Sequence, residues 1–170
     1  LADHPNAQAG TAAIEWHFIG PIQSNKTRPI AENFQWVHSV DRLKIAQRLS
    51  EQRPAHLPPL NILVQINTSG EASKSGVEPV DAIELCKTIH GLQNLKLRGL
   101  MTIPTNTDNE ELLKAEFLHC KSVFDDLNKQ GLQLDTLSMG MSADLELAIG
   151  CGSTCVRVGS ALFGARSYNT

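Results

Sequence analysis

The chain has 170 residues, of which 41% are hydrophobic and 19% are charged, and its formal net charge is -3. This length and balance predict a single globular domain over residues 1–170, with enough chain for a hydrophobic core. The negative charge and the lack of a Lys/Arg block argue against a nucleic-acid partner, and no apolar run approaches the ~20 residues that span a bilayer.

Strand-like and helical patterns alternate along the chain. The strand-like runs lie at residues 15–20, 35–40, 60–67, 95–103, 134–140 and 154–159, and the helical patterns lie at residues 41–52, 79–90 and 109–130. Several strand-like runs are almost continuously apolar, which is typical of parallel strands covered on both faces. Alternating strands and helices predict a parallel sheet.

The apolar spacing also predicts which face of each helix is buried. In the helix at residues 79–90, Val80, Ile83 and Cys86 fall in register, and Gly91 ends the pattern. In the helix at residues 41–52, one side carries Leu43, Ala46 and Leu49. The longest helix has the clearest stripe, with apolar residues at steps of three and four: Leu113, Phe117, Cys120, Phe124 and Leu127.

Two strand-to-helix junctions stand close together in the last third of the chain. In each, an apolar run ends in a Gly/Ser turn: Ser142 would cap one helix, and Gly159-Ser160 would open the other. Helix N-termini carry unpaired backbone N–H groups and partial positive charge, so two of them side by side form a cradle for phosphate. An ordinary cap or turn residue is the alternative at each position. The pairing favours a phosphorylated ligand.

The place of these junctions favours a (β/α) barrel over an open nucleotide-binding sheet. An open sheet of that kind carries a glycine-rich loop after its first strand, and no such loop follows residues 15–20. Barrels instead hold phosphate after their last two strands. A complete barrel has eight strands in about 250 residues. We therefore predict an α/β fold of the TIM type, with about the last six of eight strands present.

Arg157 is the most informative single residue. It alternates with Val156 and Val158, so one face of its strand carries a guanidinium just before the second Gly/Ser turn. In a barrel mouth, this charge would meet the ring or the phosphate of a ligand. The alternative is a core ion pair with Asp144 or Glu146, because a buried charge needs a partner.

Other candidates for a binding role lie in loops and at strand ends. Lys26 and Lys74 follow strands whose loops face the active site in a barrel, and each is either a ligand contact or a solvated lysine. His17 alternates with Phe18 and is either a contact or a core histidine. No Ser/His/Asp or HExxH signature is present, so the sequence indicates binding more clearly than catalysis.

The cysteines and the N-terminal residues bear on the cellular compartment. Cys86, Cys120, Cys151 and Cys155 lie in or beside apolar segments, and we expect buried reduced thiols. A metal pair at Cys151 and Cys155 is the alternative, but no partner motif stands elsewhere in the sequence. The first residues lack the basic-then-apolar order of a signal peptide, so we expect a cytoplasmic protein without metal.

Six motifs follow one another along most of the chain: WHFIGPIQSNK, VHSVD, INTSGEASKSGV, LRGLMTIP, SMGMSADLELAI and VRVGSALFG. In this order they resemble the pyridoxal phosphate homeostasis proteins, which are single-domain relatives of the alanine racemase barrel. The similarity runs from about Glu15 to Gly164. It implies a protein that binds pyridoxal 5'-phosphate (PLP) and buffers or delivers it without turnover. Apo-enzymes that require PLP would be its recipients, and we expect the complete protein to be a monomer.

The resemblance also implies roles for individual residues. Ser142 would bind the phosphate, and Gly159 and Ser160 would close the cradle. Arg157 matches the family's arginine beside the pyridine nitrogen, where it disfavours protonation of the ring and weakens its electron sink. Further cofactor contacts are expected from His17, Asn67 and Met139.

The cofactor-anchoring lysine is missing from the matched segment. The family holds PLP as a Schiff base on a lysine of its first barrel strand, and the resemblance places that lysine upstream of Leu1. Residues 1–15 contain no lysine. We therefore expect an N-terminally truncated chain that keeps the phosphate half of the cofactor site.

Two kinds of enzyme are the alternatives. A PLP-dependent amino-acid racemase, or another PLP enzyme of the same barrel type, would carry a further β domain that supplies a catalytic tyrosine. A phosphate-ester isomerase would need a carboxylate base at a strand end, and none is obvious. Binding of PLP without turnover is therefore the leading interpretation.

Overall fold

The computed structural model describes residues 14–70 and 75–164, and its centre is a parallel sheet. Six strands follow one another in chain order, and each pairs in parallel with the next. They are β1 (His17–Phe18), β2 (Trp36–Val40), β3 (Leu60–Gln65), β4 (Leu95–Met101), β5 (Thr136–Met141) and β6 (Cys155–Arg157). The six predicted strands and the parallel sheet are confirmed, although every strand is shorter than its predicted run, and β5 also ends one residue beyond it.

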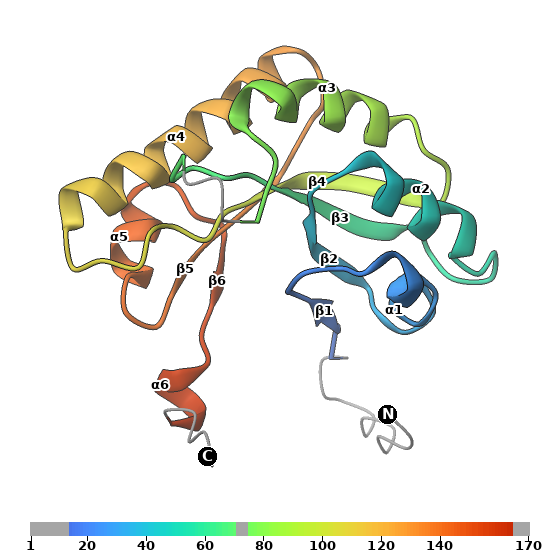
Figure 1. The fold of residues 1–170 in the computed structure, drawn as a ribbon, viewed down its shortest axis with the longest axis horizontal. Coiled ribbons are helices and arrows are strands. Elements are labelled where there is room, and N and C mark those ends of the chain that lie inside the picture. The colour runs from blue at the N-terminus through green and yellow to red at the C-terminus, as the bar shows by residue number, and fades with distance from the viewer. Residues whose placement is uncertain (1–13, 71–74, 165–170) are drawn as a thin grey trace.

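Helices cover the outer, convex face of this sheet, except for the last one, which lies beyond the end of β6 (Figure 1). They are η1 (Ser24–Lys26), α1 (Thr27–Asn33), α2 (Leu43–Gln52), α3 (Pro79–His90), α4 (Glu110–Lys129), α5 (Leu145–Gly150) and α6 (Ser160–Phe163). The sequence analysis missed α1 because this helix is short and contains a proline. Pro29 lies in its first turn, where the lack of a backbone N–H costs no helical hydrogen bond.

The sheet curls far enough for side chains of distant strands to meet on its concave face. His38 of β2 contacts Ser138 of β5, with Nδ1 lying 3.0 Å from Oγ, although β3 and β4 separate their strands in the sheet. The terminal strands β1 and β6 do not pair with each other. The fold is therefore an open, six-stranded part of a (β/α) barrel, which confirms the predicted fold class.

The two faces of the sheet differ in composition. The convex face and the helices share the main hydrophobic core, which includes Leu60, Ile62 and Val64 of β3. The concave face carries a small apolar cluster of Trp36, Leu63 and Met101. Alternation along each strand produces this division, because successive side chains point to opposite faces.

The helix faces follow the predicted stripes with one exception. The five predicted residues of α4 are all buried, whereas Val80 of α3 is 80% exposed. The buried stripe of α3 is Ala82, Cys86 and Ile89. Val80 precedes Ala82 by two residues, or about 200° around the helix, and therefore points away from the sheet. None of the helices in the described part of the chain is long and apolar enough to cross a membrane.

Gly140 allows α5 to pack closely against the end of β5. Its φ is +94°, and a Cβ added there would lie 2.6 Å from Cβ of Ala148. A side chain at this position would therefore push α5 away and shift the loop between β5 and α5. Gly131, just after α4, has nearly the same φ of +93°, but a Cβ there would meet nothing within 4 Å.

We predict that Gly140→Ala destabilises the protein more than Gly131→Ala does. Both changes force alanine into a left-handed conformation, which costs about 1 to 2 kcal/mol. Gly140→Ala adds the steric contact with Ala148, for a further ~1 to 3 kcal/mol. Urea unfolding of both variants measures the difference. Equal losses in the free energy of unfolding would show that the close approach of α5 is unimportant.

Candidate functional site

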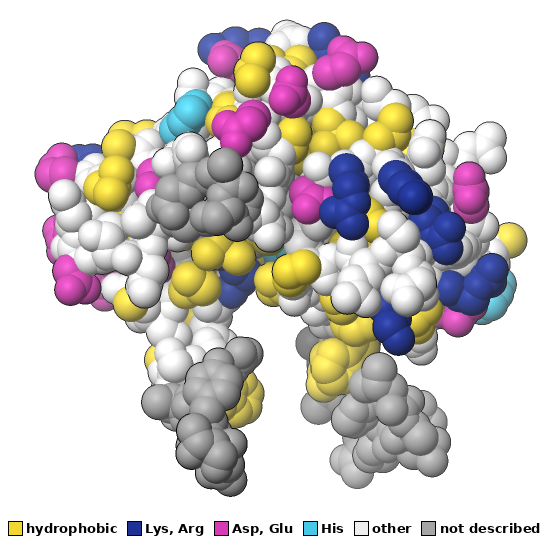
Figure 2. Space-filling view, viewed as in Figure 1, with side chains coloured by type: hydrophobic (Ala, Val, Ile, Leu, Met, Phe, Trp, Pro, Cys, Tyr) yellow, Lys and Arg dark blue, Asp and Glu magenta, His cyan; other side chains and the backbone are white. Residues whose placement is uncertain are grey.

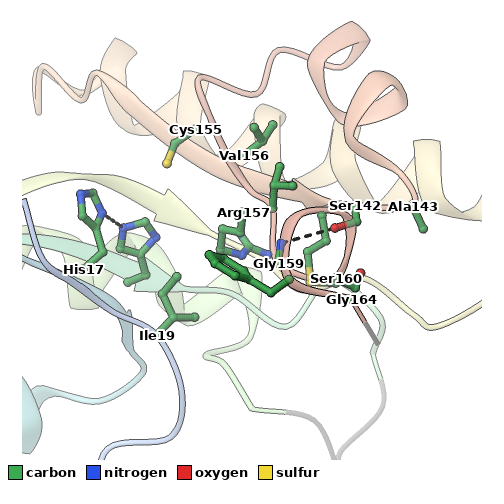
Figure 3. Close-up of a pocket in the computed structure, with 14 residues that line it drawn as sticks. His17, Ile19, Ser142, Ala143, Cys155, Val156, Arg157, Gly159, Ser160 and Gly164 are labelled. Carbon is green, nitrogen blue, oxygen red and sulfur yellow. Dashed lines mark hydrogen bonds between the residues drawn. The ribbon is translucent and has the colours of Figure 1, made fainter. Parts of the chain in front are cut away.

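A cavity of about 930 Å³ opens on the concave side of the sheet, between its two terminal strands. Figure 2 shows the molecule hollowed on this side, between the parts that carry β1 and β6. The cavity is lined by His17 of β1, His38 of β2, Arg157 of β6 and the segments at both predicted Gly/Ser junctions (Figure 3). Residues that lie more than a hundred positions apart thus share one site.

The two Gly/Ser junctions meet through the hydroxyl of Ser142. Its Oγ accepts hydrogen bonds from the backbone N–H of Gly159, at 3.4 Å, and from that of Ala161, at 3.3 Å. Gly159 is the N-cap of α6, and Ser160 is the first residue of that helix, as predicted. The hydroxyl and the N–H groups together form a small turn that can surround an anionic oxygen.

The prediction that Ser142 caps the helix that follows it is wrong. Helix α5 begins three residues later, at Leu145, and Asp144 occupies its N-cap position. The Asp144 carboxylate accepts a hydrogen bond from the backbone N–H of Met141 at 2.6 Å, which makes a tight turn after β5. Because this turn delays the helix, Ser142 points toward α6 instead of capping α5.

The Arg157 guanidinium is held on both of its terminal nitrogens by uncharged groups. Nη1 donates to Oγ of Ser138 at 2.8 Å, and Nη2 donates to the carbonyl of Thr102 at 2.9 Å. No ion pair joins Arg157 to a carboxylate within the described residues. The alternative of a core ion pair is therefore wrong. Burial lowers the pKa of Arg157, and the charge of Asp144 opposes this shift only in part.

Two histidines form a contact at the edge of the cavity. Nδ1 of His17 lies 2.7 Å from Nε2 of His38 (Figure 3). The ring of His17 also stacks on Trp36, with centroids 5.2 Å apart. Burial, followed by the charges of His17 and Arg157, lowers the pKa of His38 to about 3. Burial also lowers the pKa of His17. Both rings are therefore neutral near pH 7.

The roles of His38 and Ser138 were missed at the level of sequence. Ser138 is a polar residue between apolar neighbours in a buried strand, as Arg157 is, and this alternation is the signal that could have pointed to it. His38 lies in a fully buried strand, where a titratable side chain needs a partner. Their partners lie on other strands, however, and only the curl of the sheet brings those strands together.

The remaining predicted contacts lie away from the cavity lining. Asn67 is buried, and its Nδ2 donates to Oε1 of Glu78 at 3.1 Å. Met139 belongs to the core on the convex face, because it follows the inward-facing Ser138. Lys26 lines a second cavity, of about 460 Å³, beside α1. Lys74 lies outside the described residues.

The four cysteines are free thiols. Cys86, Cys120 and Cys151 are buried as expected, whereas Cys155 is partly exposed and lines the large cavity. Burial raises the pKa of Cys86 and Cys120 to about 12, so these two thiols remain protonated.

Comparison with known proteins identifies the family. Residues 4–167 match the model of the alanine racemase N-terminal domain. The chain is 63% identical, over 162 residues, to a pyridoxal phosphate homeostasis protein of Pseudomonas aeruginosa, an alignment that covers 95% of this chain and 69% of that protein. The chain belongs to the pyridoxal phosphate homeostasis protein family. It spans about two thirds of the length of the curated relatives it matches.

Similar solved structures support the assignment of this chain to the pyridoxal phosphate homeostasis protein family. PipY of Synechococcus elongatus, solved with PLP bound, superimposes with a TM-score of 0.81 at 34% identity, covering 89% of this chain and 71% of PipY. Alanine racemase of Clostridium difficile superimposes with a TM-score of 0.76 at 17% identity, covering 93% of this chain and 41% of the racemase. The second likeness shows a shared barrel fold.

The depressed pKa of His38 predicts how stability depends on pH. The unfolded chain takes up a proton on this imidazole below pH about 6.5, whereas the folded protein resists protonation down to about 3. The free energy of unfolding should therefore fall as the pH drops through this window, with a contribution of up to about 1.4 kcal/mol per pH unit.

Urea unfolding between pH 7 and pH 4 tests this prediction. His38→Gln should flatten the slope, because the amide does not titrate. His119→Gln, at an exposed position on α4, is the control and should keep the slope of the parent protein. An unchanged slope in His38→Gln would contradict a buried neutral imidazole.

Proposed function

We propose that this protein binds PLP in the large cavity and serves intracellular PLP homeostasis by buffering or delivering the cofactor, without catalytic turnover. The observation that carries the proposal is the pairing of an anion-binding turn with a partly buried arginine in one cavity. The names of the relatives and the PLP bound to PipY support it.

The residues of the cavity fit the two polar ends of PLP. The Ser142 hydroxyl and the N–H groups of Gly159 and Ala161 would hold the phosphate, with Ser160 at the start of α6 beside them. Arg157 would lie at the pyridine nitrogen. A guanidinium only donates hydrogen bonds, so it favours an unprotonated ring. When bound, PLP supplies a reactive aldehyde and a ring that withdraws electrons, and Arg157 weakens the second property.

Two residues bear on how PLP is anchored. We assign the Schiff base to a lysine outside the described lining of the cavity, which contains no lysine. Lys26 is no substitute, because it lines the other cavity beside α1. The protein as a whole would hold PLP covalently, whereas the residues described here would contribute its phosphate and ring contacts.

The lining of the cavity favours a carrier over a racemase. Among its described residues there is no lysine, tyrosine or carboxylate, and its two histidines are neutral and bonded to each other. Racemisation requires groups that remove and return a proton at carbon.

We further propose a monomeric cytoplasmic protein whose partners are PLP-requiring apo-enzymes.

We predict that Ser142→Ala weakens the binding of PLP and leaves the binding of pyridoxal, which lacks the phosphate, almost unchanged. A hydrogen bond to a charged group contributes about 1.5 to 3 kcal/mol, so the Kd for PLP should rise about tenfold to a hundredfold. Fluorescence titration of the protein restored to its full length measures both ligands.

Thr88→Ala is the matched control for this loss of a hydroxyl, because Thr88 lies on the exposed side of α3 and its hydroxyl donates to the carbonyl of Glu84 on the same helix. It should bind both ligands as the parent protein does. A Ser142→Ala protein that loses affinity for PLP and pyridoxal equally would contradict a phosphate site at Ser142.

We predict no steady racemisation of L-alanine or other L-amino acids by the full-length protein loaded with PLP. The reason is that the described lining holds no lysine, tyrosine or carboxylate to transfer the proton at carbon, together with the weakened electron sink. Chiral chromatography of the amino acid over many hours measures this. Sustained turnover that depends on enzyme concentration would favour the racemase alternative.

A further inference from the structure

A continuous line of hydrogen bonds crosses the interior of the barrel. It runs from His17 of β1 to His38 of β2, then to Ser138 of β5 and to Arg157 of β6, with separations of 2.7, 3.0 and 2.8 Å. Thr102, after β4, completes it by accepting from the other guanidinium nitrogen at 2.9 Å. The line joins five of the six strands of the sheet or the segments that follow them.

The middle of this line is shielded from water. His38 is 1% exposed and Ser138 is fully buried, as is Thr102. A buried polar group that loses its partner costs about 1 to 3 kcal/mol, so each member of the line holds the next in place. His17 and Arg157, at the two ends, line the cavity.

The proton positions along the line are coupled. Arg157 can only donate, so Oγ of Ser138 accepts from it. If Ser138 donates onward to Nδ1 of His38, then His38 donates to His17, and His17 presents an N–H at its other nitrogen. If Nδ1 of His38 donates to Ser138 instead, Oγ accepts from both neighbours, the step between the two histidines also reverses, and His17 presents a lone pair. The direction of the hydrogen bond between Ser138 and His38 thus decides whether the second ring nitrogen of His17 is a donor or an acceptor.

We propose that His38 is a positioning residue for Arg157: through Ser138 it fixes the orientation of the guanidinium toward the cavity, and through His17 it links that orientation to the opposite wall. Two uncharged anchors, Ser138 and Thr102, hold a cation that has no ion pair in the described structure. Loss of the Ser138 anchor would let the guanidinium rotate about its last bonds. Where the ligand is PLP, this inference rests on the proposed function.

Two substitutions of His38 separate its two contacts. In His38→Asn, the amide reaches the place of Nδ1 and can keep the bond to Ser138 while losing the bond to His17. In His38→Gln, the longer amide reaches the place of Nε2 and can keep the bond to His17 while losing the bond to Ser138. Ser138→Ala removes the same anchor by another route, with a smaller change in volume.

The first measurement uses the ligand-free protein and nitrogen-15 NMR of arginine side chains, with Arg157→Lys to assign the signals. We expect separate, slowly exchanging Nη signals of Arg157 in the parent protein and in His38→Asn. In His38→Gln and in Ser138→Ala, the signals should broaden or merge. Equal rotation rates in all four proteins would overturn the proposal. This measurement decides the matter whether or not the protein binds PLP.

The second measurement is the Kd and the absorbance spectrum of PLP bound to the full-length variants. His38→Gln and Ser138→Ala should raise the Kd about threefold to tenfold and shift the spectrum, whereas His38→Asn should stay within twofold of the parent. Thermal unfolding followed by circular dichroism shows that each variant is folded. Equal Kd values and spectra for the Asn and Gln variants would overturn the proposal, whereas failure of the parent protein to bind PLP would overturn the proposed function.

Discussion

The buried polar side chains on the concave face of the sheet find their partners on other strands, because they have no access to water. His38 and Ser138 meet this constraint together, and Arg157 completes the set by donating to the same hydroxyl. These bonds form only if β2 and β5 curl toward each other. The curvature of the sheet, the shape of the cavity and the orientation of its cation therefore depend on one buried hydrogen-bonded group.

The site combines this rigid interior with a turn built from backbone groups. Gly140 lets α5 pack against the end of β5, and Asp144 bonds back to the chain before that helix begins. Ser142 is thereby directed at the N–H groups of Gly159 and Ala161. In the proposed function, this arrangement would hold the phosphate and the ring nitrogen of PLP at fixed places. It offers a bound ligand hydrogen bonds but, among the described lining residues, little acid or base chemistry, which suits storage or transfer of a cofactor.

Much of the fold followed from local patterns. The strands, the longest helix with its stripe from Leu113 to Leu127 and the start of α6 at Ser160 were all predicted, because apolar periodicity and Gly/Ser turns are local signals. The failures were local too. A proline concealed α1, Val80 was placed on the wrong face of α3, and the turn at Asp144 moved the start of α5 beyond Ser142. Only at α5 did a neighbouring contact decide the outcome, namely the hydrogen bond from the Met141 N–H to Asp144.

The class of the fold and the two junctions that line the cavity could be predicted from residue order and spacing alone. The sequence also marked Arg157 as a charge placed among apolar neighbours. The hydrogen-bond partners of Arg157, namely Ser138 and Thr102, could be identified only from the folded structure, because they come from other parts of the sheet. The folded structure likewise joined His17 to His38 and moved Met139 to the convex face. Alternation shows that a side chain faces one side of a strand, but the curl and register of the whole sheet decide which atoms it meets there.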